Sequence, residues 1–279
     1  MDELVTTVVV TRNRADELAR SLPHHRGRVI VVDNDSDDGT VAWVRRHHPQ
    51  VELIELSTNH GAVARNVGVE AARTPYVAFA DDDSWWAPGA LDLAATCFET
   101  HERLGLLAAT VLVGPDRLLD PVSELMADSP LGVEPDLPGP SVLGFLACGA
   151  VVRRSAFVQA GGFDPVVHFG GEEERLALDL TAAGWGLAFV PAVVAHHHPA
   201  TIGRPPPVRA RARLSRNALL TAVMRRPWSV VAASARHLVV QDVAGARGVV
   251  AALPRVPRAW ARRRVLPDWL EAQRRLLDR

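Results

Sequence analysis

Three consecutive aspartates, Asp81-Asp82-Asp83, follow the apolar run at residues 76–80. Carboxylate oxygens are the ligands that hard divalent cations prefer, and such a cation binds the two phosphates of a diphosphate. Neighbouring side chains of an extended segment point in different directions, so one aspartate could reach a metal ion while the next contacts a ribose. Taken alone, the motif also fits a solvated turn or a helix cap, because short motifs carry little information.

A second acidic segment follows another apolar run, at residues 29–32. Asp33 ends that run directly, so its carboxylate is expected at the edge of a sheet, where it could accept a hydrogen bond from a bound nucleobase. The residues from Asp35 to Gly39 have the composition of a turn. Both interpretations are compatible, with Asp33 binding a ligand and the residues after it turning the chain.

Two further clusters contain groups that transfer protons or bind metals. Glu172-Glu173-Glu174 places carboxylates side by side, which raises their pKa values and suits a general base near neutral pH. The alternative is an acidic first turn stabilised by the helix dipole. The triplet His196, His197 and His198 offers imidazole ligands, although a histidine run is more often a solvated strand end.

The elements that would position these residues alternate between strands and helices. Apolar runs at residues 5–10 and 29–32 predict strands buried on both faces, further strands are expected at 51–56 and 76–80, and helical periodicity returns between them. This alternation predicts an α/β fold with a doubly wound, mostly parallel, Rossmann-like sheet. Ligands of such sheets bind beyond the carboxyl ends of the strands, which is where both aspartate segments lie.

The second half of the chain is less regular. Residues 114–140 are rich in Pro, Asp and Gly and predict a loop that covers a pocket, before a helix at 172–183 and strands at 187–190 and 193–195. Beyond Gly203 the composition shifts to Arg, Ala and Pro. We therefore expect a catalytic domain at 1–204, with halves at 1–113 and 114–204, and an Arg-rich helical tail at 205–279.

The composition excludes several classes of protein. Hydrophobic residues make up 48% and charged residues 23% of the chain, as in ordinary globular proteins, and a formal net charge of −1 gives no reason to expect nucleic acid binding. Cys97 and Cys148 lack the spacing of a metal site and predict free thiols in a reducing compartment. With no signal peptide and no apolar run of about 20 residues, we expect a cytoplasmic protein.

The tail mixes arginines with Trp228 and Trp260. That combination is typical of a segment that rests on anionic lipid, which would place the protein peripherally on the inner face of the cell membrane. The alternative is that the tail helices pack on the catalytic domain or on a second subunit of a homodimer.

Several ordered motifs together resemble the family 2 glycosyltransferases. They comprise Val9 to Arg14, Val32 to Thr40, Asn59-x-Gly61 with Ala64-Arg65-Asn66-x-Gly68, Asp81 to Asp83, Gly161-Gly162-Phe163-Asp164, Glu172-Glu173, Ala183-Gly184-Trp185, and Pro191 followed by His196 to His198. The resemblance covers roughly residues 4–217 and implies the GT-A fold. It also implies a hexosyltransferase-type enzyme that moves a sugar from a nucleotide diphosphate to an acceptor hydroxyl with inversion.

The resemblance assigns roles residue by residue. UDP is the first candidate for the donor nucleotide, with dTDP-rhamnose as a competitor; the acceptor would be a glycan, a glycolipid or a small molecule, and the product a cell-envelope polysaccharide or a related conjugate. The cofactor would be Mn²⁺ or Mg²⁺. The donor-binding residues would be Thr11, Arg12, Asp33, Asp35, Arg65 and Asp82. The metal ligands would be Asp83 and one of the three histidines, with His197 favoured, and Glu173 would be the general base beside Glu172.

The chain departs from the family pattern at two places. Glu173 stands where the family has Asp, which extends the carboxylate by one methylene group, and Arg175 and Asp179 exchange the usual charges while keeping an i,i+4 pair. Two other classes of protein remain alternatives. A sugar nucleotidyltransferase would need a glycine-rich loop after the first strand, and residues 11–14 contain no glycine. A non-catalytic nucleotide- or sugar-binding protein would have lost the aspartates or the base.

Overall fold

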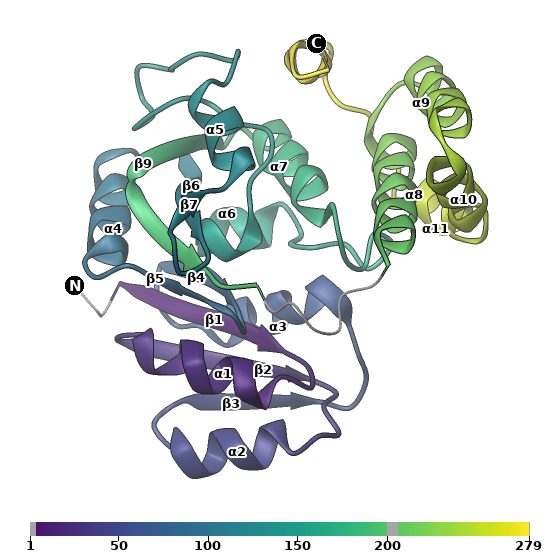
Figure 1. Ribbon diagram of the computed structural model, residues 1–279. Coiled ribbons are helices and arrows are strands. Elements are labelled where there is room, and N and C mark those ends of the chain that lie inside the picture. The colour runs from purple at the N-terminus through teal and green to yellow at the C-terminus, as the bar shows by residue number, and fades with distance from the viewer. Residues whose placement is uncertain (1–3, 200–205, 279) are drawn as a thin grey trace.

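The computed structural model describes residues 4–199 and 206–278, and within them a single mixed sheet is flanked by helices on both faces (Figure 1). The strands are β1 (Val5–Thr11), β2 (Arg28–Asn34), β3 (Glu52–Leu56), β4 (Tyr76–Asp81), β5 (Ser84–Trp86), β6 (Leu104–Val113), β7 (Leu118–Leu119), β8 (Ala150–Arg153) and β9 (Gly186–His197). The helices of the catalytic part are α1 (Ala15–Ser21), α2 (Thr40–His47), α3 (Ala64–Ala71), α4 (Ala90–Thr100), α5 (Pro121–Ala127), α6 (Arg154–Gln159) and α7 (Glu172–Ala182).

The strand order is β3-β2-β1-β4-β8-β6-β9-β5, with β7 paired to β6. The pairs β1–β2, β2–β3, β1–β4 and β6–β9 are parallel, while β8, β5 and β7 run antiparallel to their neighbours. The predicted α/β class and the mostly parallel sheet are therefore confirmed. The chain moves outward from β1 to β3 and returns on the other side at β4, so the strand order reverses between β1 and β4, where open sheets bind ligands.

Strand register places the predicted site residues in one row. Thr11 pairs with Asp33 on one side, and its neighbour Val10 pairs with Asp81 on the other. Alternation along β1 fixes the two faces: Val8 packs in one core cluster with Ala64 of α3, and Val9 packs in another with Leu18 of α1. Burial on both faces explains why this strand is a continuous apolar run.

The second half of the catalytic part differs from the expectation in detail. Residues 114–140 are not a plain loop, because they contain β7 and α5, whose cap Asp120 accepts a hydrogen bond from the backbone N–H of Val122 at 2.8 Å. The two strands expected at 187–190 and 193–195 are one strand, β9, in which a register shift accommodates Pro191. Proline has no backbone N–H and cannot donate a hydrogen bond to a neighbouring strand, so the sequence pattern indicated a break between two strands.

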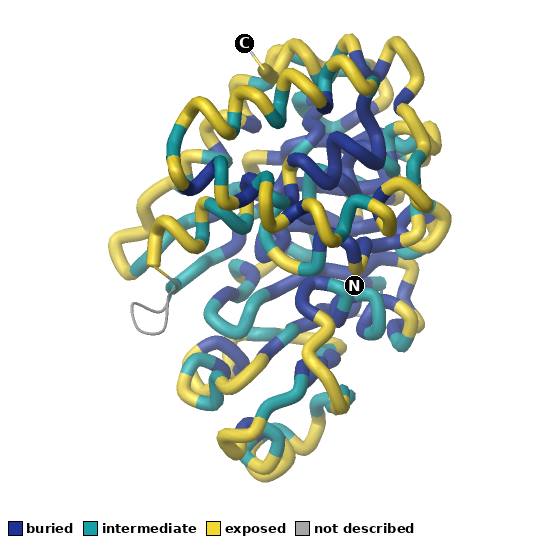
Figure 2. Tube along the Cα trace, turned by 90° about the vertical axis from the view of Figure 1, so that its right-hand side faces the viewer, coloured by how far each residue is buried: buried dark blue, intermediate teal, exposed yellow. Residues whose placement is uncertain are grey.

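The C-terminal region is helical, as predicted. It comprises α8 (Pro207–Arg225), α9 (Trp228–Gln241), α10 (Val243–Ala252), the short 3₁₀ turn η4 (Leu253–Arg255), α11 (Val256–Ala261) and α12 (Asp268–Leu276). Leu220 and Val223 of α8 pack in one cluster with Val166 and Val167 of the catalytic part, and Figure 2 shows buried and exposed stretches alternating along these helices. The expected domain boundary, between residues 204 and 205, lies outside the described residues.

Gly68 is the point of closest approach between α3 and β1. A Cβ atom on this residue would lie 2.3 Å from Cγ1 of Val8. We expect Gly68→Ala to lower the free energy of unfolding by about 1–3 kcal/mol, because the helix must move away from the strand. Urea denaturation measures the change. Gly144→Ala is the matched control, since no atom lies within 4 Å of a Cβ there, and equal effects of the two substitutions would contradict the close packing.

Candidate active site

A cavity of about 1140 Å³ opens beyond the carboxyl ends of β1 and β4. It lies between the sheet edge and the helical C-terminal region, so both parts of the chain contribute to its walls. Its lining residues from the catalytic part include Thr11, Arg12, Arg14, Asn34, Arg65, Asp81, Asp82, Asp83, His168, Phe169 and His197, and those from the C-terminal helices include Arg213, Arg216 and Arg255.

The three aspartates concentrate negative charge at the floor of this cavity. Burial, together with the neighbouring charges of Asp83 and Asp81, raises the pKa of Asp82 to about 7. Thr11 Oγ1 donates a hydrogen bond to Asp82 Oδ2 at 3.2 Å, which connects β1 to the acidic segment. A divalent cation would stabilise these carboxylates in their ionised form.

Asp83 and His197 form the arrangement that best fits a metal ion. Asp83 Oδ1 lies 3.3 Å from His197 Nε2, and both residues line the cavity. Burial lowers the pKa of His197, but the hydrogen bond and charge of Asp83 outweigh it and raise the pKa overall. A carboxylate oxygen and an imidazole nitrogen at this separation suit Mn²⁺.

The other two histidines point elsewhere. The ring of His196 stacks on Trp85 with centroids 5.7 Å apart, and the ring of His198 lies 4.6 Å from the same indole. This follows from β-strand alternation, which sends His197 to the opposite face of β9. Of the three candidates, the structure thus brings only His197 to the cavity.

Cys148 lies near the same edge, beside Asp81 and His197. Its sulfur, a carboxylate oxygen of Asp81 and a ring nitrogen of His197 all lie within 4.8 Å of one another. Burial raises the pKa of the Cys148 thiol well above its usual range, so the thiol is protonated in the absence of a metal ion.

A buried arginine connects the acidic segment to the start of α7. Arg65 pairs with Asp81 and lies 3.8 Å from Glu172 Oε1, and the Glu172 side chain is buried. Burial and the charge of Glu172 raise the pKa of Glu173 to about 8. Neither glutamate is among the residues that line the cavity, but Arg65 and Asp81, whose charges act on both, are. Glu173 is thus a half-buried carboxyl group beside the site.

The remaining predicted donor-binding residues lie at the ends of β1 and β2. Asp33 Oδ2 accepts a hydrogen bond from the backbone N–H of Ser36 at 3.0 Å, while Asp33 Oδ1 is buried without a hydrogen-bond partner among the described residues. An orphaned buried carboxylate oxygen is costly, so a ligand donor is a natural partner for it. Asp35 pairs with Arg12 at 3.6 Å, so these two side chains contact each other at the rim.

The loop before α7 is held by two asparagines. The Asn66 side chain exchanges two 2.9 Å hydrogen bonds with the backbone of Phe163, and Asn217 of α8 donates to the carbonyl of Phe169 at 2.8 Å. These contacts fix the segment that delivers Glu172 and Glu173. They give a structural reason for Asn66, a motif residue to which the sequence assigned no role.

Sequence reasoning missed part of the cavity. Asp81 and Arg14 line it although only their neighbours were assigned, and His168 and Phe169 come from a stretch that carries no motif. For Arg213 and Arg216 the sequence left two interpretations open, because the arginine run at 209–216 could lie over a bound diphosphate or form a solvated basic helix. Only the tertiary packing of α8 and η4 brings them, with Arg255, to the site.

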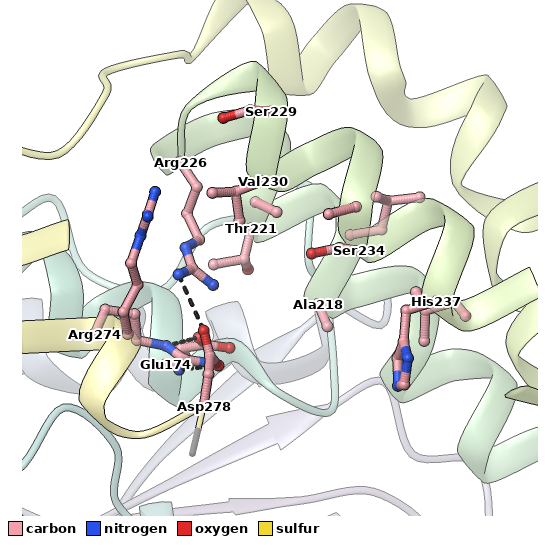
Figure 3. Close-up of a pocket in the computed structure, with 15 residues that line it drawn as sticks. Glu174, Ala218, Thr221, Arg226, Ser229, Val230, Ser234, His237, Arg274 and Asp278 are labelled. Atoms are coloured by element: carbon pink, nitrogen blue, oxygen red, sulfur yellow. Dashed lines mark hydrogen bonds and ion pairs between the residues drawn. The ribbon is translucent and has the colours of Figure 1, made fainter. Parts of the chain in front are cut away.

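A second cavity, of about 630 Å³, lies between α8, α9 and α12 (Figure 3). Its charged groups are paired: Arg274 Nε donates to Glu174 Oε1 at 2.7 Å, and Arg226 binds both oxygens of Glu271 at 3.1 Å. Such pairs hold the last helix against α7 and α8. This cavity is a junction between helices.

A family model and curated relatives point to one family. The model of glycosyl transferase family 2 matches residues 6–160. The pre-mycofactocin glycosyltransferase of Mycobacterium tuberculosis is 35% identical over 209 residues, a match that covers 70% of this chain and 43% of that protein. The N-acetylglucosaminyl-diphospho-decaprenol L-rhamnosyltransferase of the same organism is 28% identical over 246 residues, covering 74% of this chain and 80% of that protein.

Solved structures share the fold. A mannosyltransferase from Pyrobaculum calidifontis, in complex with GDP-Man and Mn²⁺, superposes with a TM-score of 0.62 at 21% identity over 92% of this chain and 74% of that chain. TarS from S. aureus, in complex with UDP-GlcNAc, gives 0.62 at 14% identity over 97% and 83%. These likenesses confirm the GT-A fold, and together with the family match they show that the chain belongs to glycosyl transferase family 2.

Proposed function

We propose that this chain transfers a sugar from a nucleoside diphosphate donor to an acceptor hydroxyl, with inversion at the anomeric carbon. The observation that carries the proposal is the grouping, at the strand-order reversal, of Asp83 and His197 with a protonatable carboxyl group, Glu173, beside the same cavity. The solved neighbours, whose complexes contain GDP-Man with Mn²⁺ or UDP-GlcNAc, support this assignment of the cavity.

Each group has a part in donor binding. Asp33 Oδ1 would accept a hydrogen bond from the base, Thr11 and Arg12 would border it, and Asp82 would contact the ribose. Asp83 and His197 would hold Mn²⁺ or Mg²⁺, which neutralises charge on the departing diphosphate when bound. Arg65 would hold Asp81 and Glu172 in place through its ion pairs.

The transfer is a single displacement. The acceptor oxygen forms a bond to the anomeric carbon while the bond from that carbon to the diphosphate breaks, and the hydroxyl proton passes to Glu173. No covalent enzyme intermediate is needed, which is consistent with inversion. Glu173 suits the task because a base with a raised pKa binds the proton more strongly.

The two substrates are proposed at the level of their class. UDP is the first candidate nucleotide, and dTDP-rhamnose competes with it because the mycobacterial rhamnosyltransferase is a relative. The acceptor would be a glycan, a glycolipid or a small molecule of cell-envelope synthesis. The chain spans less than half the length of the pre-mycofactocin glycosyltransferase, so that enzyme's full activity is not carried over to this chain.

A thermal-shift screen tests the donor class. UDP, GDP, dTDP and CDP are each added with and without Mn²⁺, and a ligand that binds only the folded chain raises its melting temperature. We expect one nucleotide to raise it in a metal-dependent way. A response to none of the four would contradict the proposal and favour a protein that kept the fold without donor binding.

The pH dependence of transfer tests the base. Because the pKa of Glu173 is raised to about 8, this group is largely protonated at neutral pH and cannot accept a proton in that state. We therefore expect kcat to increase as pH rises from 6, to reach about half of its maximum near pH 8 and to level off near pH 9. The measurement is the initial rate across that range at saturating donor. A kcat that is flat from pH 6 to 9 would remove Glu173 as the base.

The C-terminal helices are proposed to contact anionic lipid. Residues 205–279 contain 16 arginines and only four acidic residues. Exposed apolar side chains accompany them, including Val240, Val250, Leu253 and Trp260. Among the described residues, no helix is both long enough and apolar enough to span a membrane. Attachment would therefore be at the surface, through charge and partial insertion of apolar groups.

Vesicle co-sedimentation checks this contact. The chain is expected to bind vesicles that contain phosphatidylglycerol, to release them at high salt, and not to bind pure phosphatidylcholine. Trp260→Ser should weaken binding, whereas Leu125→Ser, which alters another exposed apolar residue, on α5, should not. Equal sedimentation with both kinds of vesicle would contradict an electrostatic attachment.

A further inference from the structure

Three arginines from the C-terminal helices line the cavity that contains the aspartates. Arg213 and Arg216 belong to α8, and Arg255 ends the 3₁₀ turn η4. The catalytic part supplies the opposite charge, at Asp81 to Asp83. The cavity is therefore acidic where the sheet ends and basic where the C-terminal helices border it.

These arginines lack the carboxylate partners that others in the same helices have. Among the described residues, the ion pairs of the C-terminal helices involve other arginines, such as Arg211 with Asp242 and Arg225 with Asp179, and none involves Arg213, Arg216 or Arg255. In the neighbouring cavity of Figure 3, by contrast, Arg226 and Arg274 are paired with Glu271 and Glu174. The positive charges of the three cavity arginines are therefore not neutralised by ion pairs within the described residues.

Each of the three is nevertheless held in place. Arg216 Nε donates to Asn217 Oδ1 at 2.9 Å, and Arg255 Nη1 donates to the carbonyl of Val166 at 2.9 Å. The Arg213 guanidinium lies over the ring of Phe169, 4.8 Å from its centroid, and its buried Nε has no acceptor among the described residues. Most of their N–H groups therefore remain available to a ligand.

The three guanidinium groups also act on one another. After burial, the charges of Arg255 and Arg213 lower the pKa of Arg216, and the same arginines help to lower the pKa of His168. Like charges brought together without a counterion cost free energy, which an anion between them recovers. Guanidinium forks match the oxygens of phosphate especially well.

We propose that Arg213, Arg216 and Arg255 form a phosphate-binding site that acts without the metal ion and holds a phosphate group of a substrate. Two sources share this chemistry: the diphosphate of the donor, and a phosphate carried by the acceptor, such as that of a lipid-linked sugar. The assignment of the phosphate to a donor or an acceptor rests on the proposed function. The anion site itself does not depend on that function, because binding of a phosphate compound is enough to detect it.

Isothermal titration with inorganic pyrophosphate in the presence of EDTA tests the site. The wild-type chain is expected to bind, and Arg216→Gln and Arg255→Gln are each expected to weaken binding about tenfold to a hundredfold, the effect of one charged hydrogen bond. The triple Gln variant should not bind. Arg247→Gln, at an exposed position of α10, is the matched control and should bind as the wild type does.

Two results would overturn the proposal: no binding by the wild-type chain, or undiminished binding by the single variants. Because loss of three arginines could also perturb folding, the melting temperature of each variant without ligand is compared with that of the wild type, and Arg216→Lys provides a variant that keeps the charge. Arg216→Lys is expected to restore part of the affinity lost in Arg216→Gln, because lysine supplies the positive charge but not the two parallel N–H donors of a guanidinium.

A competition experiment separates the two sources. The chain is first saturated with the nucleotide that the screen identifies, together with Mn²⁺, and then titrated with farnesyl diphosphate. If farnesyl diphosphate still binds, and does so through the arginines, the site belongs to the acceptor. If it is excluded, and the Gln variants also weaken nucleotide binding, the site belongs to the donor. A chain that transfers no sugar but binds pyrophosphate through the arginines would refute the proposed function alone.

Discussion

Replacing Glu173 with Gln is expected to lower kcat by about 10²- to 10⁴-fold, the usual contribution of a general base. Gln has nearly the same shape as Glu but cannot accept the acceptor's proton. The Asp83–His197 pair and Asp33 are untouched, so the affinity for the nucleotide with Mn²⁺ should stay close to that of the wild type. Single-turnover rates and nucleotide titrations measure the two quantities separately.

Glu174→Gln is the matched control for this substitution. Glu174 follows on the same helix, but its carboxylate accepts a hydrogen bond from Arg274 of α12 and takes no part in the proposed chemistry. We expect its kcat to stay near the wild-type value. Comparable activity of the wild type and the Glu173 variant would assign the base elsewhere, with Glu172 as the next candidate. That residue is less suited, because its side chain is buried and held by Arg65.

Much of the catalytic part could be predicted because its signals are local. A strand buried on both faces, such as β1, shows as a continuous apolar run, and a polar residue directly after it marks the carboxyl edge of the sheet. Once the strands are parallel, Thr11, Asp33 and Asp81 must meet at that edge, and the observed register brings them together. The alternation of β9 likewise separates His197 from its two neighbours, a distinction that the sequence left open.

The rest depended on contacts between distant segments. The basic wall of the cavity exists because α8 packs on Val166 and Val167, and nothing local to Arg213 or Arg255 indicates that packing. The antiparallel strand β8 was also not predicted, since a run of four residues such as Ala150–Arg153 does not reveal its partners. Arg65 shows the difference between local and distant signals. The motif around it identified it as a site residue, but its ion pairs with Asp81 and Glu172 could be seen only in the folded chain.

Asp83→Ala is expected to weaken metal-dependent nucleotide binding by at least about 100-fold. A bound divalent cation contributes several kcal/mol to the stabilisation of a diphosphate, and each 1.4 kcal/mol corresponds to a factor of ten in affinity. Removing one carboxylate from the Asp83–His197 pair leaves the ion with an imidazole and fewer negative charges. The measurement is a nucleotide titration at fixed Mn²⁺, repeated in EDTA, where the wild type and the variant should converge.

The histidines supply the matched comparison, because they are neighbours that face opposite sides of one strand. His197→Ala should resemble Asp83→Ala, since its imidazole lies 3.3 Å from the Asp83 carboxylate. His196→Ala should leave metal-dependent binding nearly unchanged, because the ring of His196 packs on Trp85. If the two histidine variants lost the same affinity, or if Asp83→Ala bound nucleotide and Mn²⁺ as tightly as the wild type, the metal would have to lie elsewhere on the acidic edge. In that case Asp81, which lies near His197 and Cys148, would be the residue to substitute next.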